Sequence, residues 1–140
     1  MSLIQNWKVA LEIGNLPKGA KMDWLSKWII LTRAQVISMT VTSALIGALL
    51  AATRGYINWA HLGLVIVALI LAHMSNNLIN DYFDYKQGID TKDYHRVQYS
   101  PHPIASGLIT EKKLLSVFFT FGLIELAIAF YLFKNTGWPV

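Results

Sequence analysis

The 140-residue sequence contains no cysteine, and charged side chains make up only 14% of it. The first absence excludes a disulfide framework, a thiolate nucleophile and a metal site built on cysteine sulfur. The phosphate-binding glycine loop, the dinucleotide fingerprint and the serine nucleophile elbow are missing as well. The scarcity of charge, combined with 54% hydrophobic side chains, lies outside the range of ordinary soluble domains. The composition therefore predicts a membrane protein.

Three long apolar segments account for this composition. They cover about residues 34–52, 62–80 and 114–132, and each reaches the roughly 19 residues that a helix needs to cross a bilayer. We predict an all-α, polytopic transmembrane bundle of three membrane helices. The segment from Asp23 to Arg33 mixes tryptophan and leucine with basic residues, and is expected to form an interfacial helix that runs into the first span.

The first 21 residues contain two helix breakers, Gly14 and Pro17. Because glycine and proline both interrupt helices, we expect that no long helix can run through this region. This region is predicted to be a loosely ordered lead-in to the interfacial helix.

Lysine and arginine alternate in number between the segments that flank the spans. The four flanking segments contain 5, 1, 5 and 1 of these residues in chain order. By the positive-inside rule, the N-terminus and the long loop from about 81 to 113 face the cytoplasm of a multi-pass cell-membrane protein. The basic residues are dispersed and no nucleic-acid motif accompanies them, so the expected partner is the lipid bilayer and not nucleic acid.

The second span ends in an unusual stretch, NNLINDYFDYKQGIDT, at residues 76–91. If the helix continues through Asp84, several polar side chains share one of its faces: His73, Asn77, Asn80, Asp81 and Asp84. Carboxylates at a helix C-terminus face the negative end of the helix dipole and repel one another. A divalent cation would relieve this, and Asp and Asn oxygens suit Mg²⁺. The alternative is a solvated, acidic helix end with no ligand.

The same stretch carries a resemblance to a known family. NDYFDYKQGID, with Asn77 one helical turn upstream, resembles the first aspartate-rich motif of the UbiA superfamily of membrane prenyltransferases. Gly88 ahead of Asp90 is most similar to the menaquinone branch, the 1,4-dihydroxy-2-naphthoate polyprenyltransferases. Arg33, at the start of the first membrane helix, also agrees with this family resemblance. So does PHPIASGLIT, which is similar to the family's Pro-x-x-Ser-Gly element but has His102 where an arginine is frequent.

The resemblance implies a function and a set of site residues. The implied reaction is the transfer of a polyprenyl group from an allylic diphosphate to an aromatic acceptor, 1,4-dihydroxy-2-naphthoate in menaquinone biosynthesis, with Mg²⁺ assisting departure of the diphosphate. Carried over to this sequence, the catalytic residues are Asp81 and Asp84, and the metal ligands are Asn77, Asp81, Asp84 and Asp90. The implied diphosphate-binding residues are Arg33, Lys86, Lys92 and Arg96.

Family members are longer and have a second aspartate-rich motif, which this sequence lacks. Residues 1–140 are therefore expected to be the N-terminal part of a prenyltransferase membrane domain, with a C-terminal half as a further partner. Two alternatives stay open. One is a prenyltransferase for another acceptor such as 4-hydroxybenzoate, and the other is a small, non-catalytic membrane protein.

Overall fold

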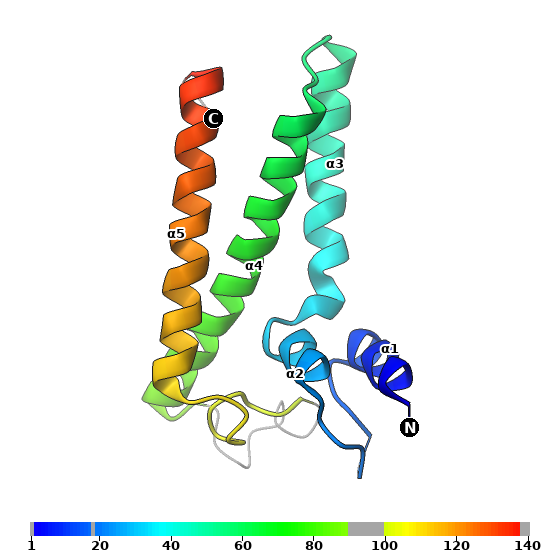
Figure 1. Cartoon of the computed structure of the whole chain (residues 1–140), viewed down its shortest axis with the longest axis vertical. Helices are drawn as coiled ribbons and strands as arrows, with labels where there is room; N and C mark the ends of the chain where they lie inside the picture. The colour runs from blue at the N-terminus through cyan, green and yellow to red at the C-terminus, as the bar shows by residue number, and fades with distance from the viewer. Residues whose placement is uncertain (1, 18, 90–99, 138–140) are drawn as a thin grey trace.

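The structure, a computed structural model, describes residues 2–17, 19–89 and 100–137. In chain order these residues form α1 (Leu3–Ile13), α2 (Trp24–Leu31), the short 3-10 helix η1 (Ala34–Val36), α3 (Ile37–Thr53), α4 (Trp59–Gln87) and α5 (Glu111–Thr136). The helices α3, α4 and α5 run along the long axis with α4 between the other two, and α1 and α2 lie at one end (Figure 1). We call this end the base. The described residues contain no strand, which confirms the all-α prediction.

Three helical stretches are long and apolar enough to cross a membrane. They are Ala34–Thr53, Trp59–Gln87 and Glu111–Thr136, so all three predicted spans are confirmed. The second helix extends well beyond the predicted end at residue 80. Because α4 continues through Asp84, Asp81 and Asp84 project from a helix and not from a loop.

The ends of the long helices follow from local capping. The side chain of Asn58 starts α4 by accepting hydrogen bonds from the backbone N–H groups of Ala60 and His61, at 3.0 and 3.1 Å. At the other end Gly88 has a φ of +67°, in the left-handed conformation that terminates helices and that glycine adopts without a Cβ penalty. The hydroxyl of Thr110 caps the start of α5 through Lys113. These signals fix both ends of α4 and the start of α5.

The expectation of a loosely ordered lead-in was wrong, because residues 3–13 form α1. Ser2 and Gln5 make a capping box at its start, and Gly14 ends it as expected from the sequence. Ala10 packs with Ile29 of α2 in a small apolar cluster. The helix is therefore held by tertiary contacts that its own sequence does not display.

Asp23 links α1 to α2. Its carboxylate caps α2 and also accepts a hydrogen bond of 2.9 Å from the indole of Trp7 in α1. Hydrogen bonds to Asp23, chiefly the one from the hydroxyl of Ser26, hold the pKa of its carboxyl well below its usual range. The hydrogen bonds to Asp23 and the apolar cluster together pack α1 against α2.

The interfacial helix does not run into the first span as predicted. α2 ends at Leu31, and Arg33 adopts a φ of +52° before η1 begins. Such a left-handed conformation is uncommon for a residue with a Cβ. The chain is therefore broken at Thr32 and Arg33, between the helix at the base and the helix that spans.

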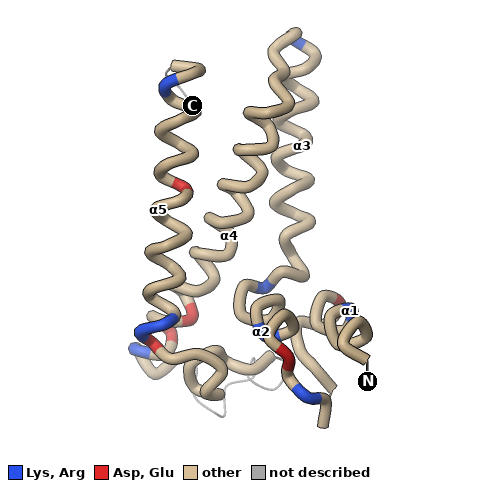
Figure 2. The backbone as a smooth tube through the Cα atoms, in the orientation of Figure 1, with Lys and Arg blue, Asp and Glu red and all other residues tan. Residues whose placement is uncertain are grey.

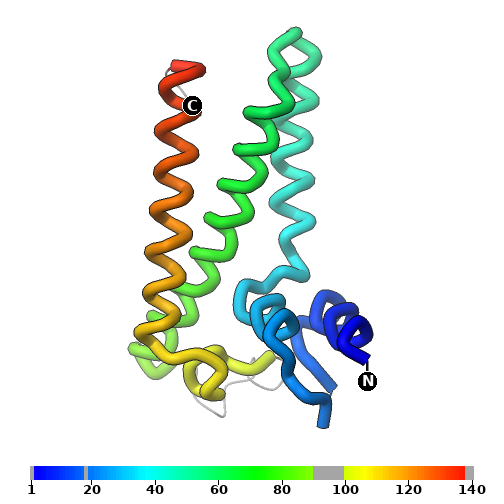
Figure 3. The backbone as a smooth tube through the Cα atoms, viewed as in Figure 1, coloured from blue at the N-terminus to red at the C-terminus, as the bar shows by residue number. Residues whose placement is uncertain are grey.

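Most of the buried core lies near the base. Leu31, Leu78, Ile109 and Leu114 form one cluster, drawn from α2, α4, the segment before α5, and α5 itself. Figure 3 shows the segment around residues 100–110 beneath the bundle, reaching from α5 toward α2. Charged residues also gather at the base, with few at the opposite end and one acidic residue midway along α5 (Figure 2). The base is thus where distant parts of the chain meet.

Candidate active site

An ion pair at the base joins two of the predicted site residues. The guanidinium of Arg33 donates to the carboxylate of Asp81, with 2.5 Å between Nη2 and Oδ1. The side chain of Asp81 is only 2% exposed, whereas that of Arg33 is 30% exposed. A buried carboxylate depends on a partner for its charge, because water cannot solvate it. The structure thus brings together residues that lie 48 positions apart in the sequence.

Asn77 supports the same contact from one turn earlier on α4. Its side-chain amide donates to the backbone carbonyl of Thr32, at 3.3 Å, and the residue is buried. This bond uses the amide nitrogen and not the carboxamide oxygen, which is the atom that binds cations. Consecutive turns of α4 therefore hold the break at Thr32 and Arg33 in place.

His102 holds Asp81 from the other side. Its Nε2 lies 3.1 Å from the carbonyl oxygen of Asp81, and its Nδ1 accepts from the backbone N–H groups of Ile104 and Ala105, each at 3.2 Å. Since Nδ1 accepts, the ring proton is on Nε2, which donates to Asp81. The role was missed from the sequence, where His102 was noted only as a departure from the family pattern. The signal that could have indicated this role was the position of His102 directly before Pro103, in the PHPIASGLIT segment.

The remaining predicted site residues form no part of the hydrogen bonds described above. Asp84 is half-buried on the turn of α4 that follows Asp81. Lys86 pairs with Glu111 at the start of α5, with 2.6 Å between Nζ and Oε2, so α5 engages this lysine. Three predicted site residues lie outside the described residues: Asp90, Lys92 and Arg96.

The described residues offer a donor set of the kind that Mg²⁺ takes. Asp81, Asp84 and Asn77 provide two carboxylates and one carboxamide along one side of α4. Within the described part of the chain, no group of three or more His, Cys, Asp or Glu side chains could hold a metal ion. Mg²⁺ needs no such group, because it binds through one or two carboxylates and completes its shell with water and substrate phosphate. The donor chemistry fits the ion, with Asp81 already compensated by Arg33.

An apolar cavity of 400 Å³ is formed between α2, α4 and α5. Thr32 and Ala34, the neighbours of Arg33, form part of its wall, and Met74 of α4 forms another part. The rest of the lining is aromatic or aliphatic: Trp24, Leu25, Trp28, Ile29, Val117 and Phe121. The wall matches a hydrocarbon chain in polarity, and it adjoins Arg33 along the chain.

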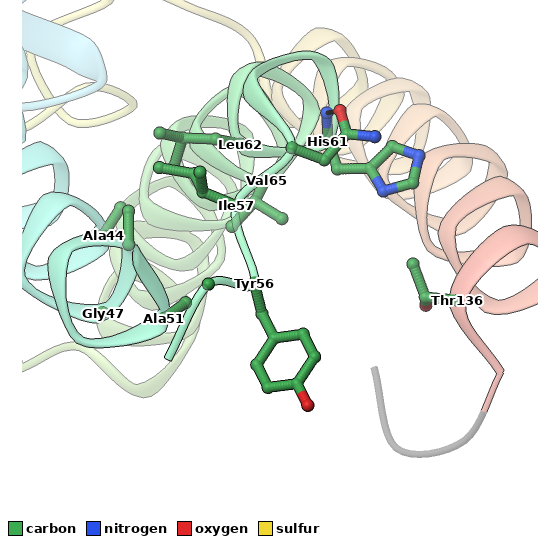
Figure 4. A pocket seen from close by; sticks show the side chains of 12 residues that line it. Ala44, Gly47, Ala51, Tyr56, Ile57, His61, Leu62, Val65 and Thr136 are labelled. Atoms are coloured by element: carbon green, nitrogen blue, oxygen red, sulfur yellow. Dashed lines mark hydrogen bonds between the residues drawn. The ribbon is translucent and has the colours of Figure 1, made fainter. Parts of the chain in front are cut away.

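A second, larger cavity of 680 Å³ lies at the opposite end of the bundle. Small residues of α3, among them Ala44 and Gly47, line one side of it. In Figure 4, His61 extends from α4 into the space toward Thr136 of α5, and Tyr56 lies at its open edge. The lining includes no charged residue, so this cavity offers no ionic partner for a diphosphate.

Two polar contacts lie deeper in the spans. Ser75 of α4 donates to the carboxylate of Glu125 in α5 at 2.9 Å. His73 of α4 is 3.2 Å from the hydroxyl of Thr40 in α3, through Nδ1. Because apolar surroundings penalise unpaired polar groups, these bonds tie α4 to both neighbours.

The fold and the site together define a polytopic α-helical membrane protein with a buried, charge-compensated carboxylate at the end of a spanning helix. A comparison with protein families matches residues 40–139 to the UbiA prenyltransferase family. The match covers more than half of the chain, including α4 with both aspartates, and the chain therefore belongs to this family. No curated protein and no solved structure matches the chain.

Proposed function

We propose that this protein acts in the transfer of a polyprenyl group from an allylic diphosphate to an aromatic acceptor at the membrane. The observation that carries the proposal is the Arg33–Asp81 pair together with an apolar cavity of 400 Å³ whose wall includes Thr32 and Ala34, the chain neighbours of Arg33. A prenyl diphosphate has the same two parts, a strongly anionic head and a hydrocarbon tail. Membership of the UbiA prenyltransferase family supports this reaction class.

The chain's own residues divide between the head and the tail of such a substrate. Arg33 would bind diphosphate oxygens, for which its planar, forked donors are suited. Asn77, Asp81 and Asp84 would hold Mg²⁺, which supplies positive charge to the diphosphate when bound. The cavity lined by Trp28 and its neighbours would take the first part of the prenyl chain.

In the proposed reaction, the bond between the allylic carbon and the diphosphate oxygen breaks, and the electron pair leaves with the diphosphate. The aromatic ring of the acceptor supplies the electron pair of the new carbon–carbon bond, and the attacked ring carbon then releases the group it carried, such as a proton, which restores aromaticity. Negative charge grows on the diphosphate as the bond breaks, so a cation bound to it, such as Arg33, stabilises the transition state more than the ground state. His102 positions Asp81 through its backbone and need not touch the substrate.

We further propose 1,4-dihydroxy-2-naphthoate as the acceptor, with a role in menaquinone biosynthesis, and a cytoplasmic orientation for the base. The acceptor rests on the similarity of the Gly88 and Asp90 spacing to that branch of the family. Gly88 ends α4 three residues after Tyr85, in a conformation that favours glycine. The orientation rests on the excess of Lys and Arg in the segments that flank the base.

The test is a calorimetric titration of the purified full chain in detergent with farnesyl thiolodiphosphate, with and without Mg²⁺. We compare the wild type with Asp81→Asn/Asp84→Asn, and use Glu12→Gln as the control because Glu12 is an exposed carboxylate on α1. Binding that needs Mg²⁺ and falls at least about tenfold in the double variant, or about 1.4 kcal/mol, supports the proposal. Equal affinity in the double variant and the control would contradict it.

A further inference from the structure

Arg33 combines two features that do not occur together elsewhere in the described chain. It is the only non-glycine residue with a positive φ among residues 2–17, 19–89 and 100–137. It is also the partner of the buried carboxylate of Asp81. Unfavourable backbone conformations persist where surrounding contacts enforce them, and here the ion pair is such a contact.

The two partners differ in how firmly they are held. Asp81 lies within the 29-residue helix α4, its carbonyl oxygen is engaged by His102, and the adjacent Leu78 is fully buried in the core. Arg33 lies between α2 and η1, no side-chain cap stabilises η1, and its own side chain is partly exposed. If the pair separates, the side chain of Arg33 is the part that can move.

The charges of the incoming ligands determine when Arg33 and Asp81 can separate. In the described structure the carboxylate of Asp81 is already compensated by a cation, so a divalent ion that binds Asp81 must displace or share with Arg33. A diphosphate has the opposite need, because it attracts a guanidinium. When a divalent ion and a diphosphate arrive together, both charges can be satisfied by one exchange of partners.

We propose that Arg33 is an exchangeable counter-ion: it neutralises Asp81 in the empty site and moves to the diphosphate when a divalent cation takes its place. This inference rests on the proposed function for the identity of the anion. It also predicts the direction of two changes in affinity. Removing the guanidinium strengthens binding of the metal alone and weakens binding of the diphosphate.

The first test uses the unaltered chain and labelling of arginine with phenylglyoxal, read by mass spectrometry. Arg33 should be labelled slowly in the free protein, several-fold faster in saturating Mg²⁺, and slowly again when farnesyl thiolodiphosphate is added with Mg²⁺. Arg54, which is exposed at the opposite end of the bundle, is the internal control and should not respond. If Mg²⁺ leaves the labelling rate of Arg33 unchanged, the exchange is overturned.

The second test measures affinity by calorimetry for Arg33→Gln, with Arg54→Gln as the matched control. Arg33→Gln should bind Mg²⁺ alone about tenfold more tightly than the wild type, because the Arg33 guanidinium no longer competes with the ion for the buried carboxylate. The same variant should bind the thiolodiphosphate more weakly than the wild type when both proteins are saturated with Mg²⁺. In Arg33→Gln/Asp81→Asn the gain in Mg²⁺ affinity should disappear.

The outcomes separate the two proposals. If Arg33→Gln binds Mg²⁺ no better than the wild type, the exchange fails whatever happens with the diphosphate. If the wild type does not bind the thiolodiphosphate at all, the proposed function fails, while the Mg²⁺ titrations still decide whether Arg33 and the metal compete for Asp81. Circular dichroism checks that each variant is folded, and the labelling experiment decides the question should Arg33→Gln not fold.

Discussion

The unequal burial of the two partners predicts unequal costs of removing them. Asp81 is 2% exposed and Arg33 is 30% exposed. Arg33→Gln removes the guanidinium that pairs with a buried carboxylate, and breaking a buried pair in this way costs about 3–5 kcal/mol of unfolding free energy. Asp81→Asn leaves a guanidinium that can reach water, so its cost is that of one charged hydrogen bond, about 1.5–3 kcal/mol.

The double variant Arg33→Gln/Asp81→Asn removes both charges. We expect it to be about as stable as Asp81→Asn alone, since the buried negative charge that makes Arg33→Gln costly is gone. The two substitutions would then be coupled by the full cost of Arg33→Gln, about 3–5 kcal/mol, which lies at or above the top of the usual range for residues in direct contact. Unfolding is followed by far-ultraviolet circular dichroism in mixed micelles with a chelator present, so that no metal compensates the carboxylate.

Arg54→Gln is the matched control, because it removes an exposed arginine at the opposite end of the bundle and should change stability by no more than about 0.5 kcal/mol. Equal losses for the two single variants would refute the reasoning from burial. Additive losses in the double variant would refute the ion pair itself.

Three further predictions concern the framework around the site. Leu78→Ala should cost about 2–5 kcal/mol because Leu78 is fully buried in the core at the base, whereas Leu123→Ala, at a 69% exposed position, should cost far less in the same unfolding assay. Gly14→Ala should lower the thermal midpoint, since the residue has a φ of +67° and an added Cβ would come within 2.5 Å of the Gln35 side chain; a midpoint equal to the wild type's would contradict this. The pKa of Asp23 is lower in the folded state than its unfolded value of about 3.9, so its contribution is present above that value and is lost as pH falls through the folded-state pKa. Asp23→Asn should therefore flatten the acid limb of a stability–pH profile, and an unchanged limb would exclude Asp23 as its source.

Several features could be predicted because they depend on neighbours along the chain. Three apolar stretches of sufficient length were enough to predict three spanning helices, and the helical period was enough to place Asn77, Asp81 and Asp84 on one side of α4. Gly14 ended a helix as expected. The cytoplasmic orientation and the naphthoate acceptor stay predictions.

Other features could not be predicted because they depend on tertiary contacts. α1 was expected to be loosely ordered, although the Ser2–Gln5 capping box was a visible local signal; its packing against α2 through Ala10 was not visible. The interfacial helix was expected to continue into the first span, but the chain breaks at Arg33. Helical propensity gave no sign of this break, because the contact with Asp81 that accompanies it comes from 48 residues further along.

The sequence by itself determined that this is a helical membrane protein with carboxylates at the end of its second span, since hydropathy and helical period act over a few turns of one segment. Only the tertiary structure decided what those carboxylates meet. It paired Asp81 with Arg33, placed His102 against the Asp81 backbone, and committed Lys86 to Glu111 instead. The reason is physical: a buried charge must be compensated by whichever cation the packing brings near, and that choice is made by the fold.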